Sequence, residues 1–256
     1  VVSTWNEAAP CNIELMRQAQ SVKKGVKFSG GTPREFCTIT VTDGIAMGHE
    51  GMKSSLVSRD VIADSTELTV RGHCYDALVG VAGCDKSLPG LMMAMLRLNV
   101  PSVFIYGGSI LPGRYNGKDV TVLDVFEGVG KYSSGKMTEH ALRKLELKAC
   151  PSAGACGGQF TANTMACVSE AIGLALPYSA GTPAPYGQRD KYALQSGKAV
   201  MNLLKKNIRP RDIVTRKSLE NAATIVAATG GSTNAALHLP ALANEIGIKF
   251  DLMDVA

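Results

Sequence analysis

The stretch Pro101-Ser102-Val103-Phe104-Ile105-Tyr106, followed by Gly107-Gly108, decides the fold class. It is a continuous apolar run of strand length, and the two glycines end it in a loop. A second apolar run of the same kind covers residues 77–82. Strands that lack polar alternation are typical of a parallel sheet buried on both faces. A third strand is predicted over residues 36–42, with a turn at Asp43-Gly44.

Helical patterns follow and separate these strands. The predicted helices cover residues 13–20, 91–98, 161–176, 218–228 and 234–246. Pro89 is suited to the first turn of the second helix, and Ser232 or Thr233 to the N-cap of the last. The polar segment 181–189 is predicted to be a surface loop. Alternation of strands and helices predicts an α/β fold: a three-layer α/β/α domain with a largely parallel sheet.

The composition excludes several classes of protein. Of the 256 residues, 45% are hydrophobic and 19% are charged, which suits a folded core and not a disordered chain. The net charge of +5 comes from scattered basic residues, so no nucleic-acid partner is expected. No apolar run reaches about 18 residues, so no membrane span is expected. Because the chain starts at Val1 and ends without a stop signal, we expect it to be a piece of a longer protein.

Seven cysteines are spread along the chain, at positions 11, 37, 74, 84, 150, 156 and 167. Their odd number and wide spacing argue against a disulfide scaffold and favour a reducing compartment. No CxxC pair is present, which removes the usual signature of zinc ribbons and thioredoxin chemistry. Cys37, Cys74, Cys150 and Cys167 fall within or at the end of predicted strands and helices, so we expect them to be packing residues.

The other three cysteines lie on loops. Cys11 stands in a Pro-Cys-Asn turn just before a helical stretch, where a helix N-terminus favours the thiolate. Cys156 lies among small residues that leave space for a bulky inorganic group. Cys84 begins the tripeptide Cys84-Asp85-Lys86, at a predicted strand-to-helix turn. Three protein ligands would leave one iron with an open position, as a catalytic Lewis acid needs, whereas four would suit a closed electron-transfer cluster.

Hard ligands accompany the thiols. Soft sulfur suits iron and hard oxygen suits magnesium, so Cys84-Asp85-Lys86 could serve two neighbouring metal centres. Asp43 closes a predicted strand, where a carboxylate could hold a divalent cation, and His49 and Glu50 are further polar candidates on the same loop. Each candidate has a purely structural alternative. Cys11 could be a small buried hydrophobic residue, and Asp43 could simply form a turn. His49 could be a surface histidine, and Cys84-Asp85-Lys86 could be a capped turn with a structural ion pair.

The motifs resemble those of a known family. Cys84-Asp85-Lys86-Ser87-Leu88-Pro89-Gly90 resembles the first signature of the dihydroxy-acid/phosphogluconate dehydratase family, and residues 154–165 (GACGGQFTANTM) resemble the second. Shorter matches are found at residues 42–45, 48–52, 106–108 and 230–234. The matches occur in the family's order and span essentially the whole chain.

The resemblance implies a set of ligands. Cys11, Cys84 and Cys156 would bind an iron–sulfur cluster, either [2Fe–2S] or [4Fe–4S], and Asp43 and Asp85 would bind Mg²⁺ beside it. Lys86 matches a lysine that some members carbamylate into one more metal ligand. Residues 1–256 would be the N-terminal α/β domain of a longer dehydratase. A C-terminal β-rich domain, with a further Glu ligand and a serine base, would lie outside this chain.

The resemblance also implies an activity. The expected enzyme is a hydro-lyase that converts 2,3-dihydroxy carboxylic acids to 2-keto acids, with 2,3-dihydroxyisovalerate and 2-ketoisovalerate of branched-chain amino-acid biosynthesis as the favoured pair. The cluster would act as Lewis acid on the leaving hydroxyl, and magnesium would stabilise the enolate. We expect a homodimer in the bacterial cytoplasm, or in a mitochondrion or plastid if a transit peptide was removed.

Three other functions remain open at this point. The nearest is a sugar-acid dehydratase of the same family, acting on an aldonate or on phosphogluconate. An iron–sulfur electron carrier or sensor is an alternative of another class. A structural zinc module is the third, and the lack of close Cys/His pairs disfavours it.

Overall fold

The computed structural model describes residues 1–255, and its core is a parallel sheet of four strands in the order β2-β1-β3-β4. The strands are β1 (Val2–Ser3), β2 (Phe36–Cys37), β3 (Leu78–Ala82) and β4 (Ser102–Tyr106). The strands β3 and β4 pair along their full length, from Leu78 opposite Ser102 to Ala82 opposite Tyr106. Every pairing in this sheet is parallel, which confirms the predicted sheet type.

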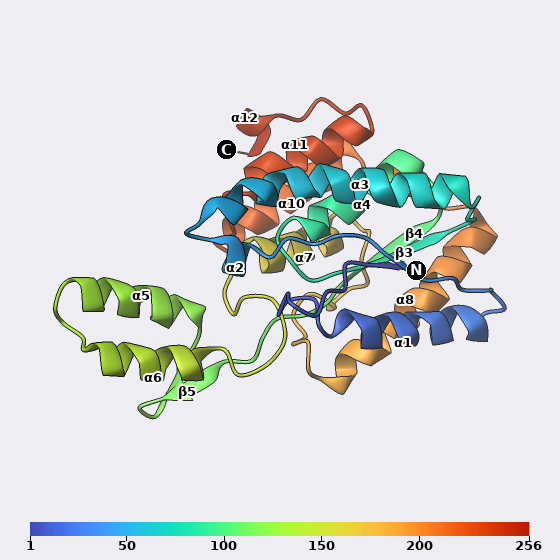
Figure 1. The fold of residues 1–256 in the computed structure, drawn as a ribbon. Helices are drawn as coiled ribbons and strands as arrows, with labels where there is room; N and C mark the ends of the chain where they lie inside the picture. Colours follow the sequence, from blue (N-terminus) through green and yellow to red (C-terminus); the bar gives the residue numbers. More distant parts are fainter. Residues whose placement is uncertain (256) are drawn as a thin grey trace.

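Helices cover both faces of the sheet. Successive side chains of a strand point to opposite sides, so each strand packs with different helices on its two faces. Val79 and Val81 of β3 pack with α1 (Leu15–Phe28) and α8 (Gly187–Lys206). Leu78 and Ala82 of β3 pack instead with α3 (Ser55–Gly72) and α4 (Ser87–Leu98). Figure 1 shows the three layers, with α3 and α4 on one side of the strands and α1 and α8 on the other. The predicted three-layer architecture is therefore confirmed.

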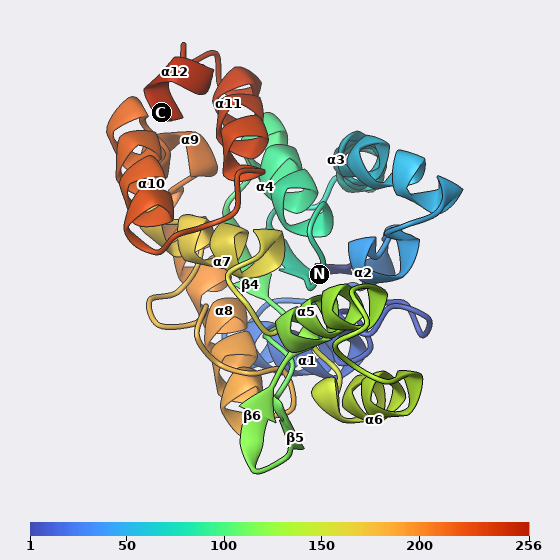
Figure 2. The same cartoon turned by 90° about the vertical axis from the view of Figure 1, so that its left-hand side faces the viewer.

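Shorter elements surround these layers. They are α2 (Asp43–Ala46), the 3₁₀ helix η1 (Glu50–Ser54), α5 (Val122–Ser133), α6 (Glu139–Ala149), α7 (Thr161–Ala171), α9 (Pro210–Ile213), α10 (Arg216–Ala228), α11 (Ala235–Glu245) and α12 (Leu252–Val255). The antiparallel hairpin of β5 (Gly113–Tyr115) and β6 (Lys118–Val120) projects from the body together with α5 and α6 (Figure 1). The helices α7 and α11 pack beside α4, and α10 packs against both of them (Figure 2).

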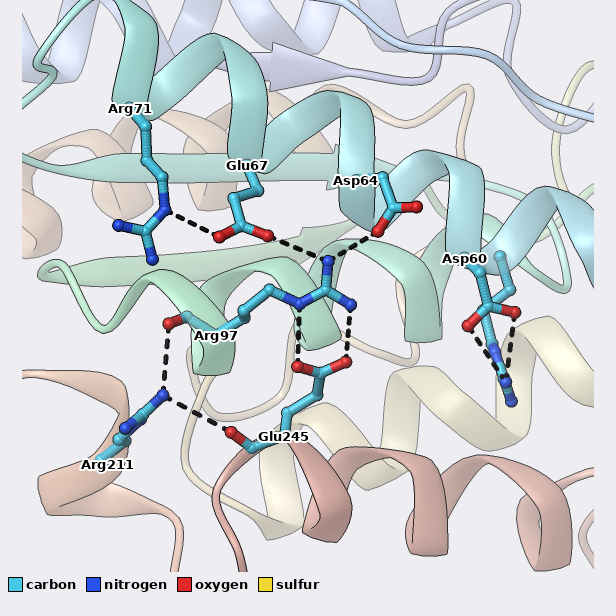
Figure 3. Close-up of polar contacts among 8 residues, drawn as sticks. Asp60, Asp64, Glu67, Arg71, Arg97, Arg211 and Glu245 are labelled. Carbon is cyan, nitrogen blue, oxygen red and sulfur yellow. Dashed lines mark hydrogen bonds and ion pairs between the residues drawn. The ribbon is translucent and has the colours of Figure 1, made fainter.

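A network of ion pairs centred on Arg97 joins α3, α4 and α11 (Figure 3). The guanidinium of Arg97, in the last turn of α4, donates to both carboxylate oxygens of Glu245, at 2.9 and 2.8 Å. Its Nη1 atom also donates to Asp64 at 2.7 Å and to Glu67 at 3.0 Å. From α9, Arg211 donates to the carbonyl oxygen of Leu96 at 2.9 Å. These bonds fix the C-terminal end of α4.

Several boundaries differ from the sequence-based expectations. The strand predicted over residues 36–42 is paired only at Phe36–Cys37, and the chain then leaves the sheet toward α2. The helix predicted over residues 161–176 ends at Ala171, because Gly173 adopts a left-handed φ of +88°. The loop predicted over residues 181–189 ends early, since α8 already begins at Gly187.

The expected packing role is wrong for three cysteines. Cys37 is exposed because β2 is an edge strand, and Cys74 is exposed in the turn after α3 with a φ of +52°. Cys150 is exposed at the C-terminus of α6 and not at the end of a strand. Cys167, on α7, is half-buried. Within residues 1–255, no helix is long and apolar enough to cross a membrane.

Candidate metal centre

The loops that carry the candidate ligands meet at the C-terminal edge of the sheet. Cys11 lies on the segment after β1, Asp43 lies on the segment after β2, and Cys84 is separated from the end of β3 only by Gly83. The ends of parallel strands share one edge, which is where α/β proteins usually bind ligands. Cys156 comes from farther along the chain, but its loop is tied to the segment after β4. There Ile110 donates its N–H to the carbonyl of Ala155 at 2.7 Å.

Backbone contacts join the three cysteine loops to one another. The N–H of Gly154 donates to the carbonyl of Pro10 at 2.9 Å, which links the loop of Cys156 to that of Cys11. The carbonyl of Cys11 in turn rests on Gly83, where a Cβ atom would lie 2.1 Å from that oxygen. Only glycine allows this approach. The loops of Cys11 and Cys84 are therefore held in direct contact.

Two of the three thiols, those of Cys11 and Cys84, are hydrogen-bonded to each other, and Cys156 lies near enough to interact with them electrostatically. Cys11 and Cys84 are buried, and the pKa of Cys84 is lowered by its hydrogen bond with Cys11. The same hydrogen bond, together with burial, raises the pKa of Cys11. Burial raises the pKa of Cys156 to about 12, and the charges of Asp85 and Cys84 act in the same direction. A bound cation would reverse this balance, because it stabilises thiolates.

The loop of Cys156 is held by an asparagine in the first turn of α7. The side-chain amide of Asn163 donates to the carbonyl of Cys156 at 2.9 Å and also to the carbonyl of Gly158. The hydroxyl of Tyr106, at the end of β4, donates to the Oδ1 atom of Asn163 at 2.5 Å. Through these bonds the sheet edge fixes the position of a cysteine that is far away in sequence.

Carboxylates and a lysine lie beside the thiols. The Nζ atom of Lys86 donates to Oδ2 of Asp43 at 2.6 Å and lies 4.0 Å from Oδ2 of Asp85. The hydroxyl of Ser55 donates to the other oxygen of Asp43 at 2.7 Å. Burial raises the pKa of Asp85, and the charge of Asp43 adds to this. The structure thus brings Asp43, Asp85 and Lys86 together.

Thr161 and the segment Gly230–Asn234 support the carboxylate of Asp85. The hydroxyl of Thr161 hydrogen-bonds to Asp85. Thr161 is held in turn by the amide of Asn234 at 2.7 Å, and its hydroxyl lies 3.1 Å from that of Ser232. The segment Gly230–Asn234 therefore acts on the carboxylate through Thr161.

The residues that orient these candidate ligands were not predicted from the sequence; they are Thr42, Ser55, Thr161, Asn163 and Asn234. All except Ser55 lie inside the short motifs that the family resemblance identified. The motifs showed that these residues matter, but only the fold shows which ligand each one contacts.

His49 and Glu50 are not brought into the group. Both are exposed: Nδ1 of His49 accepts from Gly51 at 3.0 Å, and Glu50 forms an ion pair with Lys53 at 2.6 Å. Their place is the cap and first turn of η1. The surface interpretation of His49 is the one that the structure supports.

The donor set suits the metal groups that the resemblance implies. Across the described part of the chain, no three His, Cys, Asp or Glu side chains form a compact metal-binding group. The thiols are instead near neighbours, and the two aspartates flank Lys86 next to them. Soft sulfur donors and hard oxygen donors lie in separate, adjacent sets, an arrangement that would fit two different metals.

Comparison with known proteins decides the family. The whole chain, residues 1–256, matches the family model described as "Dihydroxy-acid/6-phosphogluconate dehydratase N-terminal". The chain belongs to this dehydratase family. The family predicted from the motifs is thereby confirmed.

Curated members of the dehydratase family are very similar to the chain. A protein named dihydroxy-acid dehydratase from Pelagibacter ubique is 90% identical over 256 residues, which are 100% of this chain and 45% of that protein. One of the same name from Parvibaculum lavamentivorans is 79% identical over 100% of this chain and 44% of its own length. One from Sulfurisphaera tokodaii is 55% identical over 99% of this chain and 45% of its own length. The chain thus spans less than half the length of these relatives.

Proposed function

We propose that residues 1–256 form the N-terminal metal-binding domain of a longer hydro-lyase that converts 2,3-dihydroxy carboxylic acids to 2-keto acids. The observation that carries this proposal is the meeting of Cys11, Cys84 and Cys156 with Asp43 and Asp85 at one sheet edge. The names of the similar curated proteins support the same reaction.

The ligands divide by chemistry. Cys11, Cys84 and Cys156 would hold an iron–sulfur cluster, and Asp43 and Asp85 would hold Mg²⁺, with Lys86 as a further ligand once carbamylated. When bound, these groups supply Lewis acidity at the leaving hydroxyl and at the substrate carboxylate. Because Cys84 and Asp85 are adjacent in sequence, one proposed ligand of each kind would lie on the same turn.

The contribution of this chain is to hold the ligands still and to keep water away. Cys84 and Lys86 are 2% and 5% exposed, so charge that develops at this edge is poorly screened by solvent. Asn163 fixes the loop of Cys156, while Ser55 and Thr161 fix the two carboxylates. A preorganised site of this kind needs little rearrangement during the reaction.

The favoured substrate is 2,3-dihydroxyisovalerate, which would place the enzyme in branched-chain amino-acid biosynthesis. The family description also covers 6-phosphogluconate, so a sugar acid is the second candidate. The test is keto-acid formation by the full-length protein with 2,3-dihydroxyisovalerate, gluconate and 6-phosphogluconate. We expect the highest kcat/KM with 2,3-dihydroxyisovalerate; a preference for a sugar acid would overturn this substrate assignment.

The magnesium assignment has its own test. Asp85→Asn removes one anionic oxygen from the proposed set, and we expect the full-length variant to need a much higher Mg²⁺ concentration for half-maximal activity. Asp119→Asn is a suitable control, because Asp119 is exposed on the β5–β6 hairpin. An unchanged magnesium dependence in Asp85→Asn would remove Asp85 from the set.

The general base is proposed to be a serine outside this chain. We accordingly expect no turnover by the isolated 256 residues, even with both metals supplied, while the full-length protein is active under the same conditions. We also propose that the full-length enzyme is a homodimer in the bacterial cytoplasm, or in a mitochondrion or plastid. Turnover by the isolated chain would show that the base lies within it.

A further inference from the structure

Thr42 stands apart from the other threonines that precede helices. It occupies the N-cap of α2, yet within residues 1–255 its side chain makes no capping hydrogen bond. Thr121 and Thr138, at the N-caps of α5 and α6, accept from backbone N–H groups at 3.3 and 3.2 Å, as N-cap threonines usually do. The hydroxyl of Thr42 therefore does not cap α2, although Thr42 occupies the N-cap position.

That hydroxyl lies between two of the candidate cluster ligands. Its oxygen is 3.4 Å from Sγ of Cys84 and 3.6 Å from Sγ of Cys11. Both distances are within the range for hydrogen bonds to sulfur. No other side chain in the described residues hydrogen-bonds to both of these sulfurs. Because Cys84 and Cys11 follow different strands, Thr42 connects two loops through its side chain alone.

The chemistry of the bond depends on the state of the sulfur. A thiol can donate its proton to the hydroxyl oxygen, whereas a metal-bound thiolate can only accept. Between Thr42 and Cys84 the thiol is the donor, whereas between Thr42 and Cys11 either atom can donate. The single hydroxyl proton of Thr42 is therefore directed to Cys11 Sγ. Hydrogen bonds to the sulfurs are one of the main means by which a protein sets the reduction potential of an iron–sulfur cluster.

We propose that Thr42 is a positioning residue that donates a hydrogen bond to Cys11 Sγ and thereby raises the reduction potential of the cluster. The inference rests on the proposed function, because it requires the cluster ligands named there. The direction follows from charge: reduction makes the cluster more negative, and a donor to its ligand sulfur stabilises the more negative form. Thr42 precedes Asp43 in sequence, just as Cys84 precedes Asp85. On each of these two turns, the first residue would serve the iron–sulfur cluster and the second would serve the magnesium ion.

The test uses the full-length, cluster-loaded protein and three variants. Thr42→Val keeps the shape and removes the hydroxyl, Thr42→Ser keeps the hydroxyl, and Thr138→Val removes a capping hydroxyl far from the site. Iron and sulfide contents are measured first, and then the midpoint potential from the EPR signal of the reduced cluster. We expect a lower potential in Thr42→Val and the wild-type potential in Thr42→Ser and Thr138→Val.

Two results would overturn the inference: an unchanged potential in a fully loaded Thr42→Val protein, or equal shifts in Thr42→Val and Thr42→Ser, which would indicate packing. If Thr42→Val fails to load, resonance Raman spectra of the wild-type and Thr42→Ser proteins in H₂O and D₂O decide instead. We expect Fe–S stretching bands that shift in D₂O in both; bands that do not shift would reject the hydrogen bond. A wild-type protein that holds no iron and sulfide would contradict the proposed function itself.

Discussion

The Nζ atom of Lys86 lies 2.6 Å from Oδ2 of Asp43, and the two side chains are 6% and 9% exposed. This is a buried ion pair that joins the start of α4 to the start of α2. Ser55 donates to the second oxygen of Asp43, so the carboxylate is satisfied on both sides. The charges of such a pair depend on each other, because neither is solvated well enough to stand alone.

Removing one partner should therefore be costly. We expect Lys86→Met in the metal-free, full-length protein to lower the free energy of unfolding by about 3–5 kcal/mol, because Asp43 is left buried without its counter-charge. Lys53→Met is the matched control: its pair with Glu50 is exposed, and we expect a loss of about 0–1 kcal/mol. Urea denaturation followed by circular dichroism measures both. Similar losses in the two variants would contradict the buried-pair description.

Asn163 should control the order of the loop that carries Cys156. In Asn163→Ala, the carbonyls of Cys156 and Gly158 lose their donor, and we expect a loss of about 1–3 kcal/mol in unfolding free energy. The Cys156 thiol of the metal-free protein should also react faster with a thiol reagent. Asn202→Ala, at an exposed position on α8, is the control. Unchanged reactivity at Cys156 would show that Asn163 does not hold this loop.

His238 gives a prediction for acid stability. It is fully buried on α11, and burial, followed by the positive charges of Arg59 and Lys86, lowers its pKa from the ordinary 6.5 to about 3. Between these two pH values the unfolded chain binds a proton that the folded protein does not. The free energy of unfolding therefore falls as pH decreases through this window, by up to about 1.4 kcal/mol per pH unit from this group.

Comparison of variants isolates the histidine from the other groups that titrate. His238→Gln should show a shallower fall of unfolding free energy between pH 6.5 and pH 4 than the wild-type protein, because the residue that charges has been removed. His140→Gln, at an exposed position on α6, should keep the wild-type slope. If His238→Gln and the wild-type protein show the same slope, His238 is not the buried neutral group described above.

Breaking the Arg97 network is expected to lower the free energy of unfolding without releasing the bound metals. Arg97→Met removes a bidentate pair with Glu245 and bonds to Asp64 and Glu67 (Figure 3), and we expect a cost of about 2–4 kcal/mol. Arg114→Met breaks an exposed pair with Asp119 and should cost about 0–1 kcal/mol. Iron and magnesium contents should stay at the wild-type level in both. Metal loss in folded Arg97→Met protein would show that this network reaches the metal centre.

The strands β3 and β4 could be predicted closely from the sequence, because a strand buried on both faces leaves a continuous apolar run. The runs at residues 77–82 and 101–106 became β3 (Leu78–Ala82) and β4 (Ser102–Tyr106). In contrast, β1 is only Val2–Ser3, and two residues carry no pattern of their own. Its central place in the sheet depends on pairing with strands that are distant in sequence.

The candidate site was predictable to a similar degree. Loop position separated Cys11, Cys84 and Cys156 from the other cysteines, and the structure brings these three together. The residues that orient them could not be identified, because their partners are far away along the chain. Thr42 reaches Cys84, and Asn163 reaches back to Tyr106. A hydroxyl or an amide in a motif does not show by itself whether it caps a helix or holds a ligand.

Cys11, Cys84 and Cys156 are proposed to hold one iron–sulfur cluster together. The most direct measurement is the iron content, acid-labile sulfide and visible absorbance of full-length Cys156→Ser protein after anaerobic reconstitution, beside Cys74→Ser as the control. Cys74 is exposed in the turn after α3. We predict that Cys156→Ser loses most of its iron, sulfide and absorbance while Cys74→Ser keeps all three. Full retention of the cluster by a folded Cys156→Ser protein would contradict the account.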